Sequence, residues 1–390
     1  MYQTCFCEFG KLAAPTGLES PGLRPLLITL LLILPGALLA PGVPRAAEVV
    51  PWLYEVAVPV ENQSEQERTR ASSEGLLRLL TRLTGLNYVP RTPEVAAALA
   101  QPDGYYNEFR FSRVERNSLD TSTLEDPLQI EAPRTQLELV IQFDPEPVQG
   151  LISSAGLPIW RAQRERVLVW AVLADENGRQ IVGAASDLPL VAGLSQRARD
   201  RGLPLTLPLL DLEDQLAVDP AAVWGRLTQV IDPASRRYGA DVLLLGRISP
   251  DGTGGWRSDW EFWVDGVVVP FDAENADLKV HGLDAVDVLA DELAARRVVH
   301  GRQAGQIQLA VSGIRTPADY GALIGYVNSL EFVQSVGVTA LRDGRIWLLV
   351  DTPAEPDRLL TTFERDRQLF NDQLAQLDSA DLRLVWRGGD

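Results

Sequence analysis

Apolar and polar positions alternate along the chain in a way that predicts three successive segments of strands and helices. In the first, residues 48–156, strand-like runs and helix-like stripes follow one another in the order β-α-β-β-α. The expected strands are Trp52–Val60, Tyr105–Val114 and Thr135–Phe143. Between the last two strands lies a polar, acidic connection, Glu115–Pro133.

The main helix of this first segment has start and stop signals. Ser64 and Glu67 have the spacing of a capping box, in which Ser64 accepts the Glu67 N–H and Glu67 reaches back to the Ser64 N–H. Gly85 is placed to end the helix in the left-handed conformation. A shorter helix is expected from Thr92-Pro93 to Ala100, because proline suits a first helical turn. Another short helix is expected at Pro147–Ser154.

The second segment, residues 157–300, contains two continuous apolar runs, Val167–Leu173 and Asp241–Ile248, typical of strands covered on both faces. One helix is expected from Asp219-Pro220 through Ile231, and another around residues 283–293. A single strand, Trp256–Val269, is expected to follow the turn at residues 253–255. Buried strands joined through helices predict an α/β layer.

The third segment, residues 306–390, follows the order β-α-β-β-α-β, which is the ferredoxin-like split motif. The Asp343-Gly344 pair is a strong hairpin signal between its second and third strands. The expected strands are Gln306–Ile314, Phe332–Leu341, Arg345–Val350 and Leu382–Trp386. The sequence therefore predicts a multi-domain protein of the α+β or α/β class.

Residues 1–47 have the features of a signal peptide with an upstream extension. Arg24 precedes the uncharged apolar run Pro25–Ala40, which is shorter than the roughly 20 residues of a membrane-spanning helix. Ala46 and Ala47 offer small residues for cleavage. Both cysteines, Cys5 and Cys7, would leave with this segment. We expect a periplasmic, disulfide-free protein without a stable membrane anchor after cleavage; an uncleaved anchor is the alternative.

The charge balance bears on possible partners. The chain has 36 basic and 53 acidic residues, a formal net charge of −17. Nucleic acids bind proteins chiefly through neutralisation of phosphates, and anionic lipid surfaces attract basic segments. The acidic balance therefore argues against both kinds of partner.

The residues needed for common catalytic and metal sites are scarce. The only histidines are His281 and His300, and no G-x-S-x-G nucleophile elbow occurs. Without the two N-terminal cysteines the chain cannot assemble the His or Cys ligand sets that zinc prefers. Gly252 to Gly255 lacks the lysine of a phosphate-binding loop and fits a turn instead. We expect no metal, no cofactor and no catalytic residues, so the chain is more consistent with a binding protein than with an enzyme.

The strongest polar cluster is Asp211, Glu213 and Asp214, within the sequence LDLED. Acidic residues are common at helix starts, where the helix dipole favours them. The same carboxylates are also candidates for contact with a ligand or partner, including Ca²⁺ or Mg²⁺. As a third alternative, they could share acid–base work on a glycan.

A second candidate binding feature is aromatic. Strand alternation places Trp256 and Trp260 on one face and Trp263 on the other. Such a pair can form a platform for a sugar or peptide. Large aromatic side chains on one strand face are, however, usually core residues.

Several stretches resemble the proteobacterial domain-of-unknown-function-2066 family over roughly residues 48–300. They are LYEVAVPV at residues 53–60, the 65–85 helix, AGLPIWRAQRERVLVWAVL at 155–173, RGLPLTLPLLDLED at 201–214 and RRYGADVLLLGRI at 236–248. The resemblance implies a signal-peptide-bearing periplasmic protein with no established activity. More weakly, YGADVLLLGRI resembles TolB amino-terminal-type α/β envelope modules.

Two functional hypotheses follow. The first is a non-catalytic periplasmic module that binds another envelope protein or a cell-wall component. The second is a periplasmic hydrolase of glycan or peptide that uses Asp211, Glu213 or Asp214.

Overall fold

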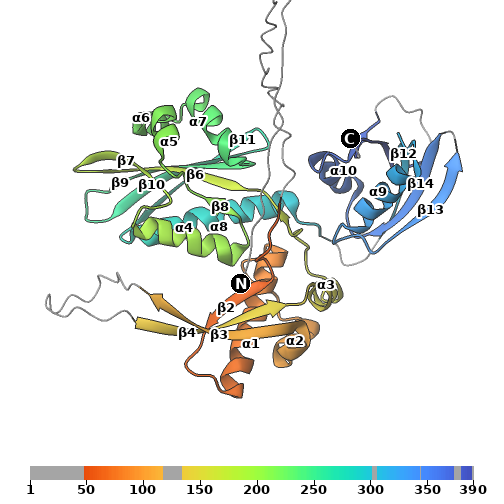
Figure 1. Ribbon diagram of the computed structural model, residues 1–390, viewed down its shortest axis with the longest axis horizontal. Helices are drawn as coiled ribbons and strands as arrows, with labels where there is room; N and C mark the ends of the chain where they lie inside the picture. The colour runs from red at the N-terminus through yellow and green to blue at the C-terminus, as the bar shows by residue number, and fades with distance from the viewer. Residues whose placement is uncertain (1–47, 117–133, 301–304, 343, 373–378, 389–390) are drawn as a thin grey trace, which may run out of the picture. The chain divides into compact units, whose positions relative to one another are not determined.

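The computed structural model describes residues 48–116, 134–300, 305–342, 344–372 and 379–388 (Figure 1). The predicted signal peptide, residues 1–47, lies outside this part of the chain, as does most of the acidic connection. By their contacts, the described residues all belong to one unit, Pro44–Asp390. Within the described ranges, no helix is both long enough and apolar enough to cross a membrane. The chain is a mixed α/β protein with several sheets.

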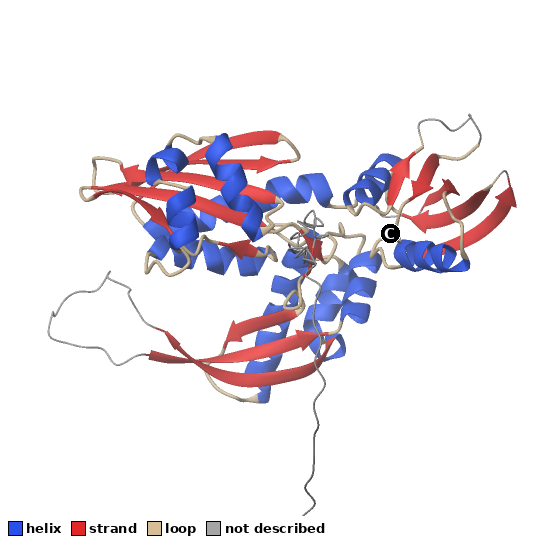
Figure 2. Cartoon of the chain, turned by 45° about the horizontal axis from the view of Figure 1, so that its top comes forward, coloured by secondary structure: helices blue, strands red, loops and turns tan. Residues whose placement is uncertain are grey.

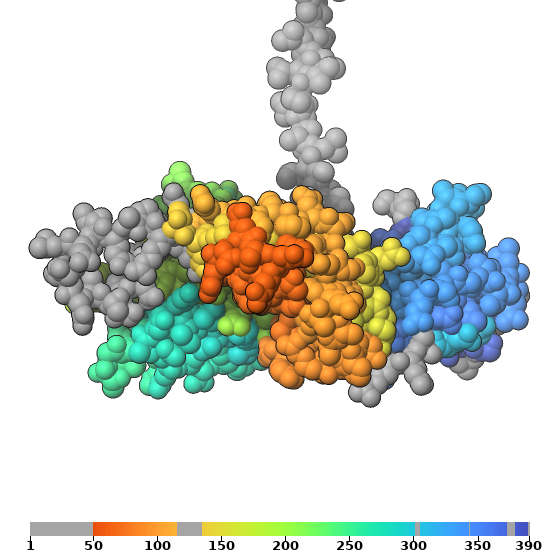
Figure 3. Space-filling model, turned by 90° about the horizontal axis from the view of Figure 1, so that it is seen from below, coloured from red at the N-terminus to blue at the C-terminus, as the bar shows by residue number. Residues whose placement is uncertain are grey.

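The first layer is a three-stranded antiparallel sheet in the order β2-β4-β3, with helices packed against it. The predicted order of strands and helices is confirmed. Figure 3 shows the surface of this layer in orange-red to yellow. The elements are β2 (Glu55–Pro59), α1 (Glu65–Thr84), α2 (Pro93–Ala100), β3 (Tyr106–Arg116), β4 (Arg134–Phe143) and α3 (Pro145–Ser154).

The start of α1 differs from the predicted capping box. The Ser64 hydroxyl accepts the Glu67 N–H at 3.3 Å, as expected. The Ser64 N–H, however, donates to the Asn62 side chain at 2.9 Å, so it is not available to Glu67. The Glu67 carboxylate instead accepts the Glu61 N–H at 3.2 Å and pairs with Arg70. The reciprocal half of the predicted box is therefore wrong, whereas Gly85 ends the helix with φ 71° as predicted.

The second layer is a sheet in the order β11-β10-β9-β6-β7, with β8 beside β6. Its central strands β6 and β9 are parallel and contain the two apolar runs seen in the sequence. Helices lie on both faces of this sheet (Figure 2), and a buried cluster fills each side. The strands are β6 (Val167–Asp175), β7 (Gly178–Val182), β8 (Leu205–Thr206), β9 (Val242–Pro250), β10 (Trp256–Val264) and β11 (Val267–Asn275). The helices are α4 (Pro189–Arg201), α5 (Leu212–Ala217), α6 (Pro220–Trp224), α7 (Thr228–Ser235) and α8 (Leu278–Arg297).

Two predictions for this layer are wrong. The helix expected over residues 219–231 is broken into α6 and α7, because Arg226 between them has φ 53° and pairs with Asp259 and Glu261 of β10. The expected strand Trp256–Val269 is a hairpin of β10 and β11. It turns at Asp265-Gly266, where both residues have positive φ, as tight two-residue hairpins require.

The third layer is a five-stranded sheet in the order β13-β14-β12-β16-β15. The pair β12–β16 is parallel, and the other neighbours are antiparallel. All four predicted strands and both helices are present, and the short strand β15 was not predicted. The elements are β12 (Gly305–Ser312), α9 (Pro317–Asn328), β13 (Ser335–Arg342), β14 (Arg345–Thr352), α10 (Pro356–Arg365), β15 (Leu369–Asn371) and β16 (Leu382–Trp386).

The segment between the first two layers is anchored by buried contacts. The Trp160 N–H donates to the Leu83 carbonyl of α1 at 2.8 Å. Arg161, with 8% of its side chain exposed, forms ion pairs with Glu331 at 3.3 Å and with Asp366 at 2.7 Å. The expected boundaries 48–156, 157–300 and 306–390 stay a prediction, since this segment contacts residues on both sides of them.

Candidate functional site

The acidic cluster predicted from LDLED lies at the start of α5. Asp211 is the N-cap of this helix, and its Oδ1 accepts the Asp214 N–H at 3.0 Å. Asp214 is buried and accepts the Leu210 N–H at 2.9 Å and the Tyr238 hydroxyl proton. The Arg237 guanidinium contacts all three carboxylates, at 2.7 Å for Asp211, 3.4 Å for Glu213 and 3.1 Å for Asp214. The structure thus brings the predicted residues together in the arrangement that helix capping predicts.

The electrostatics of this cluster do not favour acid–base work. Hydrogen bonds from Arg237, followed by the backbone N–H of Asp214, hold the pKa of Asp211 well below its usual range. A glycosidase needs one carboxyl whose pKa is raised, so that it can donate a proton. Burial and the hydrogen bond to Asp214 raise the pKa of the Tyr238 phenol. Asp211 is therefore suited to a permanently charged structural role.

Removing the guanidinium tests this description. We expect Arg237→Gln to raise the pKa of the Asp211 carboxyl toward that of an ordinary aspartate, because its main hydrogen-bond donor is lost. The measurement is a carboxyl-carbon NMR titration. Because folding lowers the pKa of the Asp211 carboxyl, the Asp211–Arg237 pair stabilises the protein fully at pH values above the unfolded-state pKa of about 4. This stabilisation is lost as the pH falls through the pKa that Asp211 has in the folded protein. A low Asp211 pKa in the variant would contradict the assignment.

Beside the acidic cluster lies an apolar surface that the sequence pattern does not reveal. Leu209, Leu212 and Leu216 are 60%, 71% and 80% exposed, and we call them the leucine surface. Leu212 and Leu216 are four residues apart on α5 and therefore share one helix face. Leucines at this spacing normally predict a buried face, which is why the sequence alone does not reveal exposure.

The backbone beneath the leucine surface is held in place. Leu210 has φ 55°, a left-handed conformation that is unfavourable for leucine. It persists because the Leu210 N–H donates to Asp214 and the Gln215 amide donates to the Leu210 carbonyl at 2.7 Å. The Leu209 N–H donates to the Tyr238 hydroxyl oxygen at 3.0 Å. A strained backbone conformation of this kind persists only where several surrounding contacts fix it, and such conformations often lie at functional positions.

The predicted aromatic platform lies mostly in the core. Trp260 is 0% exposed and stacks on Phe271 with ring centroids 6.3 Å apart. Trp256 is half-buried and packs against the same core cluster. Trp263 projects to the other face, where its Nε1 donates to Glu261 at 3.3 Å. In this structure Trp260 has no surface with which to contact a sugar or a peptide.

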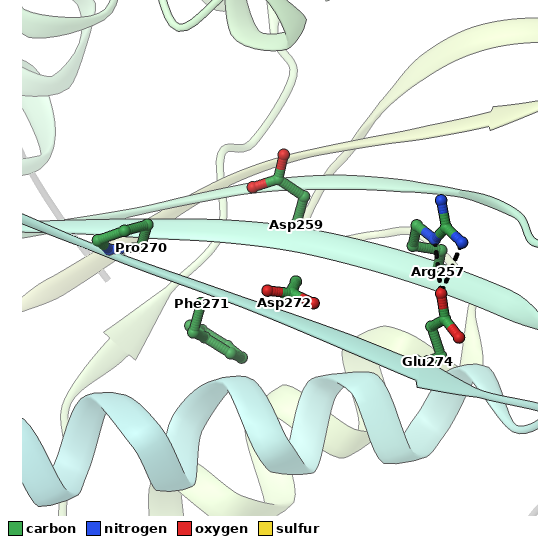
Figure 4. A pocket seen from close by; sticks show the side chains of 6 residues that line it. All are labelled: Arg257, Asp259, Pro270, Phe271, Asp272 and Glu274. Carbon is green, nitrogen blue, oxygen red and sulfur yellow. Dashed lines mark hydrogen bonds and ion pairs between the residues drawn. The ribbon is translucent and has the colours of Figure 1, made fainter.

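A polar pocket of about 450 Å³ lies on the β10–β11 hairpin (Figure 4). Arg257 pairs with Glu274 across the two strands at 2.6 Å. Asp259 and Asp272 are direct cross-strand partners, and Asp259 is neutralised by Arg226 and Arg247. Within the described residues, no group of three or more His, Cys, Asp or Glu side chains is arranged to hold a metal ion. In this pocket Asp259 and Glu274 are paired with arginines, and Asp272 is exposed. The described side chains that line it form no set of metal ligands.

The structure also brings together a serine and a histidine that sequence spacing did not connect. The His281 Nδ1 lies 2.6 Å from the Ser258 hydroxyl, and its Nε2 lies 3.3 Å from the Asn275 carbonyl. In the neutral imidazole, Nε2 carries the proton because a carbonyl can only accept, and Nδ1 then accepts the Ser258 O–H. Both residues are 0% exposed, so the pair joins α8 to the hairpin and presents no nucleophile to solvent.

Comparison with known families gives one match. Residues 47–161 match a family described as a domain of unknown function (DUF8605). This range covers the first layer and the start of the segment that follows it. A search of curated proteins finds no match for this chain. The similarity thus concerns the first layer and names no activity.

Proposed function

We propose that this protein is exported to the periplasm and acts there as a non-catalytic binding or assembly module of the cell envelope. The observation that carries the binding role is the leucine surface, because exposed large apolar side chains that are grouped on a rigid element mark interaction sites. The apolar run Pro25–Ala40 behind Arg24 supports export. The likeness to the domain-of-unknown-function-2066 family supports the same location.

The charge around the leucine surface indicates the partner's chemistry. Asp211, Glu213 and Asp214 together carry three negative charges against the single positive charge of Arg237. Glu213 is the most exposed of the three, with 71% of its side chain accessible. We infer that the partner is an amphipathic segment of an envelope protein, with apolar side chains against the leucines and flanking Lys or Arg. Complementary charge of this kind speeds association and selects against wrong partners.

We also propose finer fold relationships for two layers. In the third, the strand order β13-β14-β12-β16 with both helices in the β-α-β-β-α-β sequence supports a ferredoxin-like domain. In the second, the parallel pair β6–β9 joined through helices supports a likeness to TolB amino-terminal-type modules. These likenesses concern architecture and say little about activity.

The hydrolase alternative receives less support from the geometry. Asp211 and Asp214 are occupied by backbone N–H groups, Arg237 and Tyr238. A two-carboxylate hydrolase needs its acids free on either side of a substrate, with one of them protonated. Of these three carboxylates, Glu213 alone has most of its side chain in solvent.

In vivo photocrosslinking tests the proposed function. With p-benzoylphenylalanine at position 213, we expect a defined adduct with an envelope protein whose crosslinked peptide contains apolar and basic residues. Leu212→Glu with Leu216→Glu should reduce the adduct about tenfold or more, because the apolar contact is lost and carboxylates facing the partner's apolar side chains would be desolvated without a partner. Leu341→Glu is the matched control, since Leu341 is 77% exposed on β13. An adduct that the double variant leaves unchanged would count against the proposal.

A further inference from the structure

A second concave site lies between the first layer and α4. A pocket of about 350 Å³ is lined by an aromatic ring, by apolar side chains, by two hydroxyl-bearing residues and by an arginine. Its lining residues are Trp52, Ser195, Ala198, Arg199, Leu203, Pro204, Leu205 and Thr206. Its wall exposes polar and apolar surface in about equal parts. Convergent polar groups beside apolar surface are typical of small-ligand sites. None of the lining residues belongs to the leucine surface.

Arg199 stands out among the arginines of α4. Arg197 pairs with Asp287, and Arg201 pairs with Asp287 and Asp291. Arg199, by contrast, has no ion pair or side-chain hydrogen bond to any residue in the described ranges, although the chain carries a net charge of −17. Its guanidinium carbon lies 5.8 Å from the centre of the Trp52 ring. The Trp52 ring thus holds the Arg199 guanidinium at the pocket, where no described residue supplies a counter-ion.

Trp52 is itself held in place. The buried Arg82 lies over the same ring, with its guanidinium carbon 5.5 Å from the ring centre. Arg82 is fixed by the backbone carbonyls of Leu53 at 2.8 Å and Glu55 at 2.9 Å. The ring therefore offers a preorganised apolar surface, which lowers the ordering cost of binding.

The remaining groups add donors. The hydroxyls of Ser195 and Thr206 make no hydrogen bonds to residues that the structure describes. Strand β8 pairs only with β6 among the described strands, so the other edge of Leu205–Thr206 has no strand partner there. Among the residues that the structure describes, no carboxylate lines the pocket, and this disfavours a cationic ligand.

We propose that this pocket binds a carboxylate attached to an apolar group. The carboxylate pairs with Arg199 and accepts hydrogen bonds from Ser195 and Thr206, while the apolar body packs on Trp52, Pro204 and Leu205. A single guanidinium matches one carboxylate in charge and in planar geometry. Both a free organic acid and the C-terminus of a peptide with an apolar last residue have this chemistry.

Calorimetry with defined probes tests the proposal on the protein comprising residues 48–390. The probes are 4-phenylbutanoate, the peptide N-acetyl-Ala-Ala-Leu with a free carboxylate, and the same peptide as its C-terminal amide. We expect submillimolar binding of at least one carboxylate and at least tenfold weaker binding of the amide, because the charge-assisted hydrogen bonds are lost. Arg199→Gln should weaken carboxylate binding about tenfold or more.

The matched control is Arg179→Gln. Arg179 also lies over a tryptophan, with its guanidinium carbon 4.2 Å from the centre of the Trp224 ring, but it is not part of this pocket. This variant should bind as the unmodified protein does, and circular dichroism should show both variants folded. Preference for the peptide acid would identify a C-terminal tail as the ligand, and preference for phenylbutanoate a free acid. No binding of either carboxylate, equal binding of the amide, or unchanged binding by Arg199→Gln would overturn the proposal.

Discussion

Gly193→Ala is expected to destabilise the protein by about 3 kcal/mol or more, because the added methyl group meets backbone rather than a movable side chain. A Cβ on Gly193 of α4 would lie 2.2 Å from the Lys279 carbonyl oxygen of α8. The approach is reciprocal, since a Cβ on Gly282 of α8 would lie 2.4 Å from the Leu190 carbonyl oxygen of α4. The two helices would have to separate and give up part of the core beneath them.

The measurement is urea-induced unfolding followed by fluorescence and circular dichroism. Gly321→Ala is the control, because Gly321 is also inside a helix but a Cβ there would meet nothing within 4 Å. That variant should gain about 0.5–1 kcal/mol from the better helix propensity of alanine. If both substitutions changed the free energy of unfolding equally, Gly193 would not be what allows α4 and α8 to cross so closely.

The sequence predicted those parts of the fold that have a local signal. The continuous runs in β6 and β9 identified the buried centre of the second sheet, and Gly85 correctly marked the end of α1. Asp265-Gly266 is also a local signal, but apolar residues continue on both sides of it, so the pattern predicts one strand where the structure has two. The glycine contact between α4 and α8 could not be predicted, because its partners are far apart in the chain.

The same distinction applies to the candidate sites. The acids at 211, 213 and 214 are visible as a cluster, whereas Arg237 and Tyr238, which pair and hydrogen-bond with them, follow more than twenty residues later. The exposure of Leu212 depends on where α5 lies on the sheet, and amphipathic spacing alone predicts burial. Trp52 and Arg199 meet only through the packing of α4 near the first layer. Pockets built from distant residues carry no periodic signature.

Trp260→Ala is expected to cost about 3–5 kcal/mol, the range for removing a fully buried large aromatic side chain. Trp260 has 0% exposure, stacks on Phe271 and lies directly opposite Gly246 in the β9–β10 register. A ligand platform would behave differently, since truncating an exposed ring lowers affinity and leaves stability nearly unchanged. Unfolding by urea therefore separates the two interpretations of this tryptophan.

Gly246 supplies a second, independent measurement. A Cβ on Gly246 would lie 2.4 Å from the Trp260 ring, so Gly246→Ala alone should destabilise the protein. In the Trp260→Ala background the ring is gone and the same substitution should cost much less, giving a coupling energy of about 1–3 kcal/mol in the double-mutant cycle. Trp263→Ala, on the opposite strand face and half-buried, should cost only about 1 kcal/mol. Additive effects of the Trp260 and Gly246 substitutions would contradict the core packing described here, because two groups in such close contact cannot contribute independently.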